Sequence, residues 1–170
     1  MTADREGFPE FVDQRQRALL RSAWLLTGDW ALAEDLVQTA LARTWLRWER
    51  IRRHDDPEIY VRRVLLSTWV NWSRRKWRGE RPWNELRDCP APGDLAAEVA
   101  ARVAVRAALG SLTDRQRAVL VLRVFDDLTE AQTAQVLGCA VGTVKSTMSQ
   151  ALARLRADRA VAELPERENW

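Results

Sequence analysis

LTEAQTAQVLGCAVGTVKSTMSQALARLR, residues 128–156, predicts two helices joined by a tight turn. Thr129 followed three residues later by Gln132 is a capping-box pattern, which pairs the free amides at the start of a helix. Gly138 stands where a helix end needs a residue that tolerates a left-handed backbone, and residues 139–141 would make the turn. The first helix would then carry one apolar face, made of Ala131, Ala134 and Leu137.

The second helix of this pair has two contrasting faces. Its apolar face recurs at helical spacing and consists of Val144, Met148, Ala151, Leu152 and Leu155. The opposite face offers small polar groups and a cation, which can approach base edges and phosphates in a major groove: Thr143, Lys145, Ser146, Ser149 and Gln150. The pattern predicts a helix-turn-helix whose second helix reads duplex DNA. The alternative is an ordinary helical hairpin with a solvated polar face, because short-loop helix pairs are common.

The composition indicates a globular, helix-rich chain without catalytic or metal-binding residues. Of 170 residues, 46% are hydrophobic and 30% charged, and no segment alternates long enough to predict a sheet, so we expect an all-α fold. A single histidine, His54, and two isolated cysteines, Cys89 and Cys139, leave no metal cluster or disulfide framework. We therefore expect no catalytic residues, no metal, no cofactor and no enzyme activity.

The ends and the hydropathy of the chain predict a cytoplasmic protein. No apolar run approaches the roughly 18 residues of a membrane span. The N-terminus MTADREGFPE lacks the apolar core of a signal peptide. Unpaired cysteines favour a reducing compartment.

The N-terminal part predicts three helices. The first carries Phe11, Ala18 and Leu25 and ends at Thr27-Gly28-Asp29, where Asp29 is suited to cap the second. The third begins at Asp56-Pro57-Glu58, which is a strong start signal. The second helix has one stripe of Ala33, Val37, Ala40, Thr44 and Trp48, and the third has a core stripe of Val61, Val64, Leu65, Thr68 and Trp72.

A proline-containing stretch divides the chain into two small helical domains. GERPWNELRDCPAPG has no sustained period and predicts a linker over residues 79–93, between a domain at 1–78 and a helix-turn-helix domain at 94–158. The second domain would open with a helix capped by Asp94 and ending near Gly110, and Thr113 with Gln116 forms a second capping box. Residues 159–170 would be a charged tail.

Basic and aromatic residues are concentrated between Tyr60 and Pro82, where seven cationic side chains face one acid, a local charge of +6. Such a field favours a polyanion. Flat aromatics among arginines suit unstacked bases, each worth about 1–3 kcal/mol on stacking. We expect Trp69 and Trp77 to be exposed and Trp72 to lie on the core stripe; the alternative is that all three are buried.

The two DNA-directed stretches resemble a known family. DWALAEDLVQTALARTWLRWERI (29–51) and DPEIYVRRVLLSTWVNWSRRKWR (56–78) resemble the second conserved region of bacterial sigma factors. LTDRQRAVLVLRVFDDLTEAQTAQVLGCAVGTVKSTMSQALARLR (112–156) resembles their fourth. AEDLVQTALARTW and VGTVKS are the specific motifs. With no sizeable domain between the regions, the chain resembles the extracytoplasmic-function subgroup of the sigma-70 family, actinobacterial type.

The resemblance implies an initiation factor that binds core RNA polymerase and promoter DNA. It implies polymerase contacts at Asp35, Gln38, Thr39, Leu41, Arg43, Trp45 and Arg47, with the two arginines pairing with acidic residues of the polymerase. It implies binding of the separated −10 strand by Ser67, Asn71, Arg74, Arg75, Lys76 and Trp77. It implies reading of the −35 duplex by Thr143, Lys145, Ser146, Ser149 and Gln150, with Arg154 on phosphate.

The same resemblance implies how the protein is regulated and shows where this sequence differs from its relatives. A separate anti-sigma factor is the usual control in the family, and the chain is expected to be monomeric. Thr147 stands where many relatives have a basic residue, which predicts the loss of one phosphate or base contact.

Two other classes of protein remain open. One is a helix-turn-helix repressor with a ligand-sensing N-terminal half, although a repressor normally dimerises on a palindrome. The other is a helical adaptor whose Trp-rich half binds protein.

Overall fold

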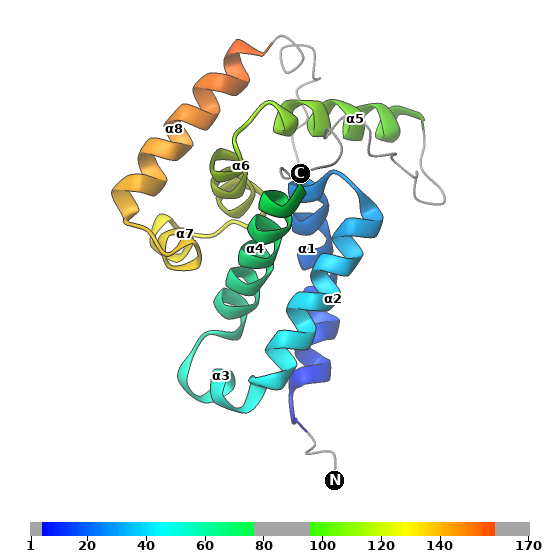
Figure 1. The fold of residues 1–170 in the computed structure, drawn as a ribbon, viewed down its shortest axis with the longest axis vertical. Helices are drawn as coiled ribbons and strands as arrows, with labels where there is room; N and C mark the ends of the chain where they lie inside the picture. Colours follow the sequence, from blue (N-terminus) through cyan, green and yellow to red (C-terminus); the bar gives the residue numbers. More distant parts are fainter. Residues whose placement is uncertain (1–4, 77–95, 159–170) are drawn as a thin grey trace.

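The computed structural model describes residues 5–76 and 96–158, and all regular structure in these ranges is helical (Figure 1). The all-α prediction is confirmed. We refer to residues 5–76 as the N-terminal half and to residues 96–158 as the C-terminal half. The predicted linker lies outside the described residues. The helices in chain order are α1 (Phe8–Thr27), α2 (Trp30–Leu46), α3 (Trp48–His54), α4 (Pro57–Lys76), α5 (Ala96–Gly110), α6 (Asp114–Leu120), the π-helix η2 (Val121–Phe125), α7 (Glu130–Leu137) and α8 (Val141–Ala157).

The junction of α1 and α2 forms as its sequence predicts. Gly28 adopts the left-handed conformation at φ 70° and donates its N–H to the Trp24 carbonyl oxygen at 2.7 Å. The Asp29 carboxylate then accepts the Leu32 N–H at 2.8 Å and caps α2. At the far end of this half, the Asp56 carboxylate accepts the Glu58 N–H at 2.9 Å as α4 begins. These ends are set by residues adjacent to them in the chain.

The second predicted helix is interrupted, so the N-terminal half has a fourth helix that the sequence analysis missed. α2 stops at Leu46, Arg47 leaves the helical conformation, and α3 starts at Trp48. The Trp48 ring is buried against Phe8 and Phe11, and its Nε1 donates to the Glu6 carbonyl oxygen at 2.9 Å. The prediction that Trp48 continues the α2 stripe was wrong, because this contact with the start of α1 turns its ring inward.

Both predicted capping boxes are present in the C-terminal half. Thr113 pairs reciprocally with Gln116 at the start of α6, and Thr129 pairs with Gln132 at the start of α7. Gly138 ends α7 in the left-handed conformation at φ 65°. The buried face of α7 differs from the predicted one, because Ala131 is exposed. The residues that α7 buries are Thr133, Ala134 and Val136.

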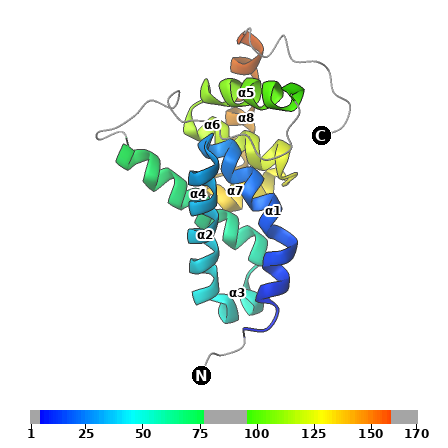
Figure 2. The ribbon, with the colours of Figure 1, turned by 90° about the vertical axis from the view of Figure 1, so that its right-hand side faces the viewer.

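A single hydrophobic cluster runs through both halves of the molecule. Buried side chains of α1, α2 and α4 are continuous with those of α6, η2 and α8. α4 packs against α2 and, on another side, against α7 (Figure 1). α5 lies at the end of the molecule opposite α3, as the side view shows (Figure 2).

Candidate nucleic-acid and protein interfaces

The outer face of α8 is solvent-exposed, while its inner stripe is buried. Val144 and Ala151 are 1% and 0% exposed, and Met148, Leu152 and Leu155 are half-buried against the core. The predicted −35 residues lie on the opposite side: Thr143 is half-buried, and Lys145, Ser146, Ser149, Gln150 and Arg154 are exposed. Small hydroxyls and two cations on one helix face are available to an approaching duplex. We call these six residues the α8 outer face.

Two observations bear on which α8 side chains can contact DNA. The Lys145 Nζ lies 3.6 Å from a carboxylate oxygen of Glu130, in a pair whose side chains are both exposed. Such a pair is worth little and is readily exchanged for a phosphate. Thr147 is only 6% exposed, on the inner side of α8. Thr147 makes no contact with DNA from this buried position, and the loss of a contact that many relatives make there stays a prediction.

The predicted −10 residues form an exposed strip along the end of α4. Ser67, Asn71, Arg74 and Arg75 are exposed, and Lys76 is the last residue of the helix. Trp77 lies outside the described residues. Two adjacent arginines and an amide on one helix end can neutralise phosphates and bond to unpaired bases. We call Ser67, Asn71, Arg74 and Arg75 the α4 strip.

Trp69 does not belong to the α4 strip. Its ring is 4% exposed, and the Arg117 guanidinium of the C-terminal half lies over it at 5.8 Å from the ring centroid. The prediction that Trp69 is exposed was wrong, because α6 of the C-terminal half brings a side chain onto it. Trp72 is half-buried against the core, as its stripe position predicts.

A shallow apolar groove separates α1 from α2. It encloses about 440 Å³, and its lining residues are Phe8, Val12, Gln16, Gln38, Leu41, Ala42, Trp45 and Leu46. Gln38, Leu41 and Trp45 were predicted to bind the polymerase. Leu46 was not, although it is 71% exposed. Its position between Trp45 and Arg47, two residues that the resemblance assigns to the polymerase contact, is the sequence signal that could have identified it.

The remaining predicted polymerase residues lie in different surroundings. Asp35 is exposed and Thr39 half-buried on α2. Arg43 instead donates from Nη1 to the Thr68 hydroxyl at 3.0 Å, and Arg47 donates from Nη1 to the Tyr60 hydroxyl at 3.3 Å. Both arginines therefore point toward α4 and help to join it to α2.

No group of three His, Cys, Asp or Glu side chains in residues 5–76 and 96–158 could hold a metal ion. Within the same ranges, no helix has the length and apolar character to cross a membrane.

Comparison with known proteins identifies the family of these two halves. Residues 11–79 match the family described as Sigma-70 region 2, and residues 102–155 match the one described as Sigma-70, region 4. The chain belongs to the sigma-70 family. It is 42% identical to the RNA polymerase sigma-E factor of Streptomyces coelicolor over 160 residues, which cover 94% of this chain and 90% of that protein.

Further relatives specify the subgroup and the fold. The ECF RNA polymerase sigma factor SigM of Mycobacterium tuberculosis H37Rv is 30% identical, over 91% of this chain and 78% of that protein. The sigma factor RpoE of Bartonella quintana, solved in complex with the anti-sigma factor NepR, superposes with a TM-score of 0.74 at 23% identity, over 94% and 98% of the two chains. The chain is an extracytoplasmic-function sigma factor of actinobacterial type, and it acts in promoter-directed transcription initiation.

Proposed function

We propose that this sigma factor binds core RNA polymerase through the groove between α1 and α2, the separated −10 strand through the α4 strip, and the −35 duplex through the α8 outer face. The observation that carries the proposal is the exposed outer face of α8, presented after a capped α7 and a left-handed Gly138. Nucleotide addition remains with the polymerase, so the chain performs no bond-making step. It acts in the cytoplasm, beside the polymerase and the chromosome.

The groove suits a helical partner. It offers apolar side chains flanked by the polar Gln16 and Gln38, and an exposed Leu46 stands at its edge. An amphipathic helix binds such a groove with apolar residues at helical spacing. A helical coiled coil of the polymerase is the partner that the family resemblance implies.

The decisive experiment is transcription by purified core polymerase on genomic DNA fragments, with and without the protein. New start sites that depend on the protein are expected. Shifts of duplex fragments by the protein alone, without any transcripts, would instead favour a repressor.

Leu46→Asp tests the groove in the same assay. Burying a carboxylate in an apolar contact is costly, so we expect core polymerase to bind at least about tenfold more weakly, a loss of about 1.4 kcal/mol. Val103→Asp is the matched control, because Val103 is 51% exposed on α5 of the other half. Equal binding by the two variants would place the polymerase contact elsewhere.

Lys145→Ala tests the α8 outer face. Removal of a phosphate contact weakens binding to all duplex sequences alike and lowers the salt slope by about one. Arg115→Ala, at an exposed cation of α6 outside the α8 outer face, is the control. Unchanged affinity and salt slope for Lys145→Ala would exclude a phosphate contact.

An anti-sigma factor is the regulator we propose, because a neighbouring solved structure is that of the sigma factor RpoE in complex with the anti-sigma factor NepR. Affinity purification of the tagged chain from its host should recover one. Recovery of core polymerase alone under all growth conditions would argue against it.

A further inference from the structure

A second pocket lies at the α3 end of the molecule, where the segment before α1 meets the end of α2 and the start of α3 (Figure 1). It has a volume of about 450 Å³, and its lining residues are Arg5, Leu46, Arg47, Glu49 and Arg50. We call it the basic pocket. Leu46 also lines the groove between α1 and α2, so the two cavities adjoin each other. Unlike the groove, the basic pocket is lined mainly by guanidinium groups.

Aromatic packing places the Arg5 guanidinium at the basic pocket. Its Cζ lies over the Trp45 ring, 4.6 Å from the ring centroid, and a cation in this position is attracted by the ring. The next residue is held through its main chain, because Trp48 Nε1 donates to the Glu6 carbonyl oxygen at 2.9 Å. Phe8 packs edge-on against both tryptophan rings. A cation from the segment before α1 therefore joins the two that come from the junction of α2 and α3.

The three guanidinium groups of the basic pocket have no carboxylate partner among the residues that the structure describes. Arg5 Nη1 is buried and has no hydrogen-bond acceptor there. Arg50 is exposed and forms no ion pair within residues 5–76 and 96–158. Arg47 donates to the Tyr60 hydroxyl at 3.3 Å, a neutral acceptor that leaves its charge uncompensated. Because a buried donor without an acceptor is unfavourable, an oxyanion in the pocket would be stabilised.

The acidic side chain that lines the basic pocket is already paired with cations outside it. Glu49 Oε2 lies 3.0 Å from Arg52 Nη2 and 3.4 Å from Arg53 Nη2. Glu6 and Asp55 are exposed to water and are not among the lining residues. The charge of Glu49 is therefore compensated on α3 and does not cancel the charges of the three pocket arginines.

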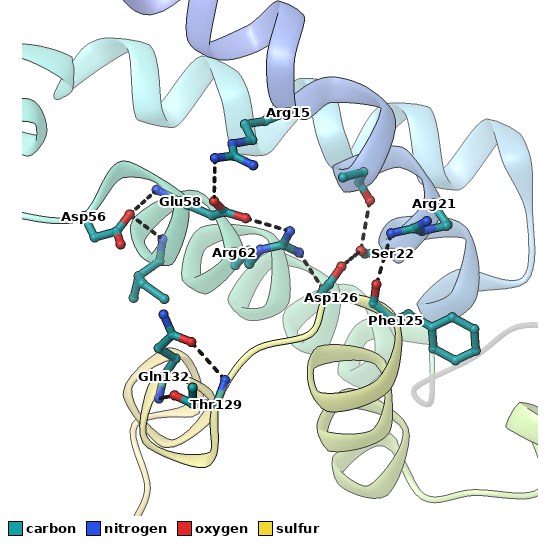
Figure 3. Close-up of polar contacts among 12 residues, drawn as sticks. Arg15, Arg21, Ser22, Asp56, Glu58, Arg62, Phe125, Asp126, Thr129 and Gln132 are labelled. Atoms are coloured by element: carbon teal, nitrogen blue, oxygen red, sulfur yellow. Dashed lines mark hydrogen bonds and ion pairs between the residues drawn. The ribbon is translucent and has the colours of Figure 1, made fainter. Parts of the chain in front are cut away.

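The acidic residues at the start of α4 are engaged as well. The Asp56 carboxylate accepts the Glu58 N–H at 2.9 Å and caps the helix (Figure 3). One Glu58 carboxylate oxygen lies 3.1 Å from Arg62, and the other lies 3.2 Å from Arg15 (Figure 3). Neither carboxylate forms an ion pair with an arginine of the basic pocket. The pocket therefore keeps a positive potential, which attracts an anion.

The size and chemistry of the basic pocket suit a phosphorylated small molecule. Guanidinium groups donate two parallel hydrogen bonds to a phosphate, which makes arginine well suited to recognise it. The volume of about 450 Å³ falls in the range of small-molecule sites, about 300–1,000 Å³. The pocket is also separate from the α4 strip, because Arg47 contacts α4 at Tyr60, about 20 Å along the helix from Arg74.

We propose that the basic pocket binds a phosphorylated small molecule and that Arg5, Arg47 and Arg50 hold its phosphate groups. Arg5 reaches the ligand from the segment before α1, and the other two reach it from the junction of α2 and α3. Binding involves no covalent step. The site goes beyond the proposed function, since its occupation requires neither polymerase nor promoter.

The first experiment titrates the full chain with inorganic pyrophosphate by isothermal titration calorimetry, in a phosphate-free buffer. Wild type should bind one pyrophosphate per chain. Arg50→Gln removes an exposed guanidinium, so the fold should be retained, and the loss of a charge-assisted hydrogen-bond donor should weaken binding at least about tenfold. No binding of millimolar pyrophosphate by wild type would overturn the proposal.

Arg17→Gln is the matched control, because it removes the same charge from an exposed position of α1 outside the basic pocket. Salt screens such a distant charge, so the affinity for pyrophosphate should change by less than about twofold. Equal losses from Arg17→Gln and Arg50→Gln would indicate general charge attraction and overturn the proposal. Arg5→Gln, which lies before the first helix, should weaken binding as Arg50→Gln does, and it repeats the test if circular dichroism shows that Arg50→Gln has lost helix.

A second titration separates the small ligand from DNA, which carries the same phosphate chemistry. A single-stranded oligonucleotide should bind wild type and Arg50→Gln with equal affinity, because the basic pocket is separate from the α4 strip. A loss of oligonucleotide affinity that matches the loss of pyrophosphate affinity would assign the pocket to the DNA backbone and overturn the small-molecule site. Failure of wild type to bind core polymerase would refute the proposed function and leave these titrations unaffected.

Discussion

The α7–α8 pair and the preceding segment, residues 121–127, are neighbours in the chain but are held in different ways. We call residues 121–127 the η2 junction. The pair is bounded by the Thr129–Gln132 capping box and by Gly138, all close in sequence. The η2 junction is held by side chains such as Ser22, which lies 104 positions from Asp126.

This difference distinguishes structure that is set by neighbouring residues from structure that requires contacts between the two halves. The ends of α7 depend on caps within the C-terminal half, although Val136 of α7 and Ala151 of α8 lie in the hydrophobic cluster that both halves share. The η2 junction depends on side chains of the N-terminal half. The following substitutions test this division.

The largest effect on the free energy of unfolding is expected at Arg117, because its side chain makes contacts both within the C-terminal half and with the N-terminal half. Its guanidinium donates to Leu109 and Leu112 in its own half and to Leu26 in the other. Burial lowers its pKa to about 10, partly offset by Asp114, so it stays charged at neutral pH. Arg117→Met leaves three buried carbonyl oxygens without donors and should lower the free energy of unfolding by about 3 kcal/mol, measured with urea. Arg115→Met, at an exposed neighbour, should change it by less than about 0.5 kcal/mol.

The next effect is expected at Gly138, within the locally determined pair. A β-branched side chain at φ 65° is strained, although no other atom obstructs a Cβ there. Gly138→Val should therefore destabilise the chain by about 1–2 kcal/mol and weaken duplex binding. Gly138→Asn is the control, because asparagine tolerates this conformation. Equal losses from both variants would show that packing, and not the backbone angle, sets the cost.

A smaller effect of opposite sign is expected at Gly142, in the first turn of α8. A Cβ there meets no atom within 4 Å in the free chain. Gly142→Ala should stabilise the fold by up to about 1 kcal/mol, because alanine has the higher helix propensity. If the start of α8 lies close against DNA, the same variant should bind the −35 duplex more weakly. Unchanged binding would show that the backbone at Gly142 leaves room for a methyl group.

The smallest expected effect is a change in the free energy of unfolding with pH, caused by the Asp126 carboxyl of the η2 junction. Burial raises the pKa of the Asp126 carboxyl above its ordinary value of 3.8, and Arg62, Ser22 and Arg21 offset part of the rise. A carboxyl with a raised pKa contributes stability that is fully present at low pH and is lost as pH rises through the raised value. Lowering the pH from 7 toward the ordinary carboxyl value of 3.8 should therefore stabilise wild type relative to Asp126→Asn in urea titrations.

The control for the pH effect is the adjacent exposed carboxylate. Asp127→Asn is this control, because Asp127 is next to Asp126 in the chain and is exposed to water. An identical change in both variants would show that the effect does not come from the buried carboxyl.

The sequence predictions were accurate where structure is set by neighbouring residues. Helix ends at Gly28, Asp29, Thr113, Thr129 and Gly138 were predicted, because each depends on residues a few positions away. The faces of α8 were predicted, because burial there follows a single helical period. The family resemblance was confirmed by the matches to both conserved regions.

The failures occur where a distant part of the chain determines the outcome. Trp69 was predicted to be exposed, but Arg117 of the other half covers it. The break before Trp48 depends on contacts with Phe8 and Phe11. Nothing in the sequence around Asp126 indicates that Ser22 and Arg62 would meet it. The roles of individual residues at the polymerase and DNA surfaces stay predictions.

The covalent connection between the halves changes how strong their contact must be. Residues 77–95 keep α4 and α5 in one chain, and tethered partners experience effective concentrations on the order of millimolar. A contact that would bind two separate proteins with a Kd of only about 0.1 mM then keeps about nine chains in ten closed, and opening costs only about 1.4 kcal/mol. An interface far too weak to be isolated as a complex of two separate proteins can thus hold the two halves of this chain together.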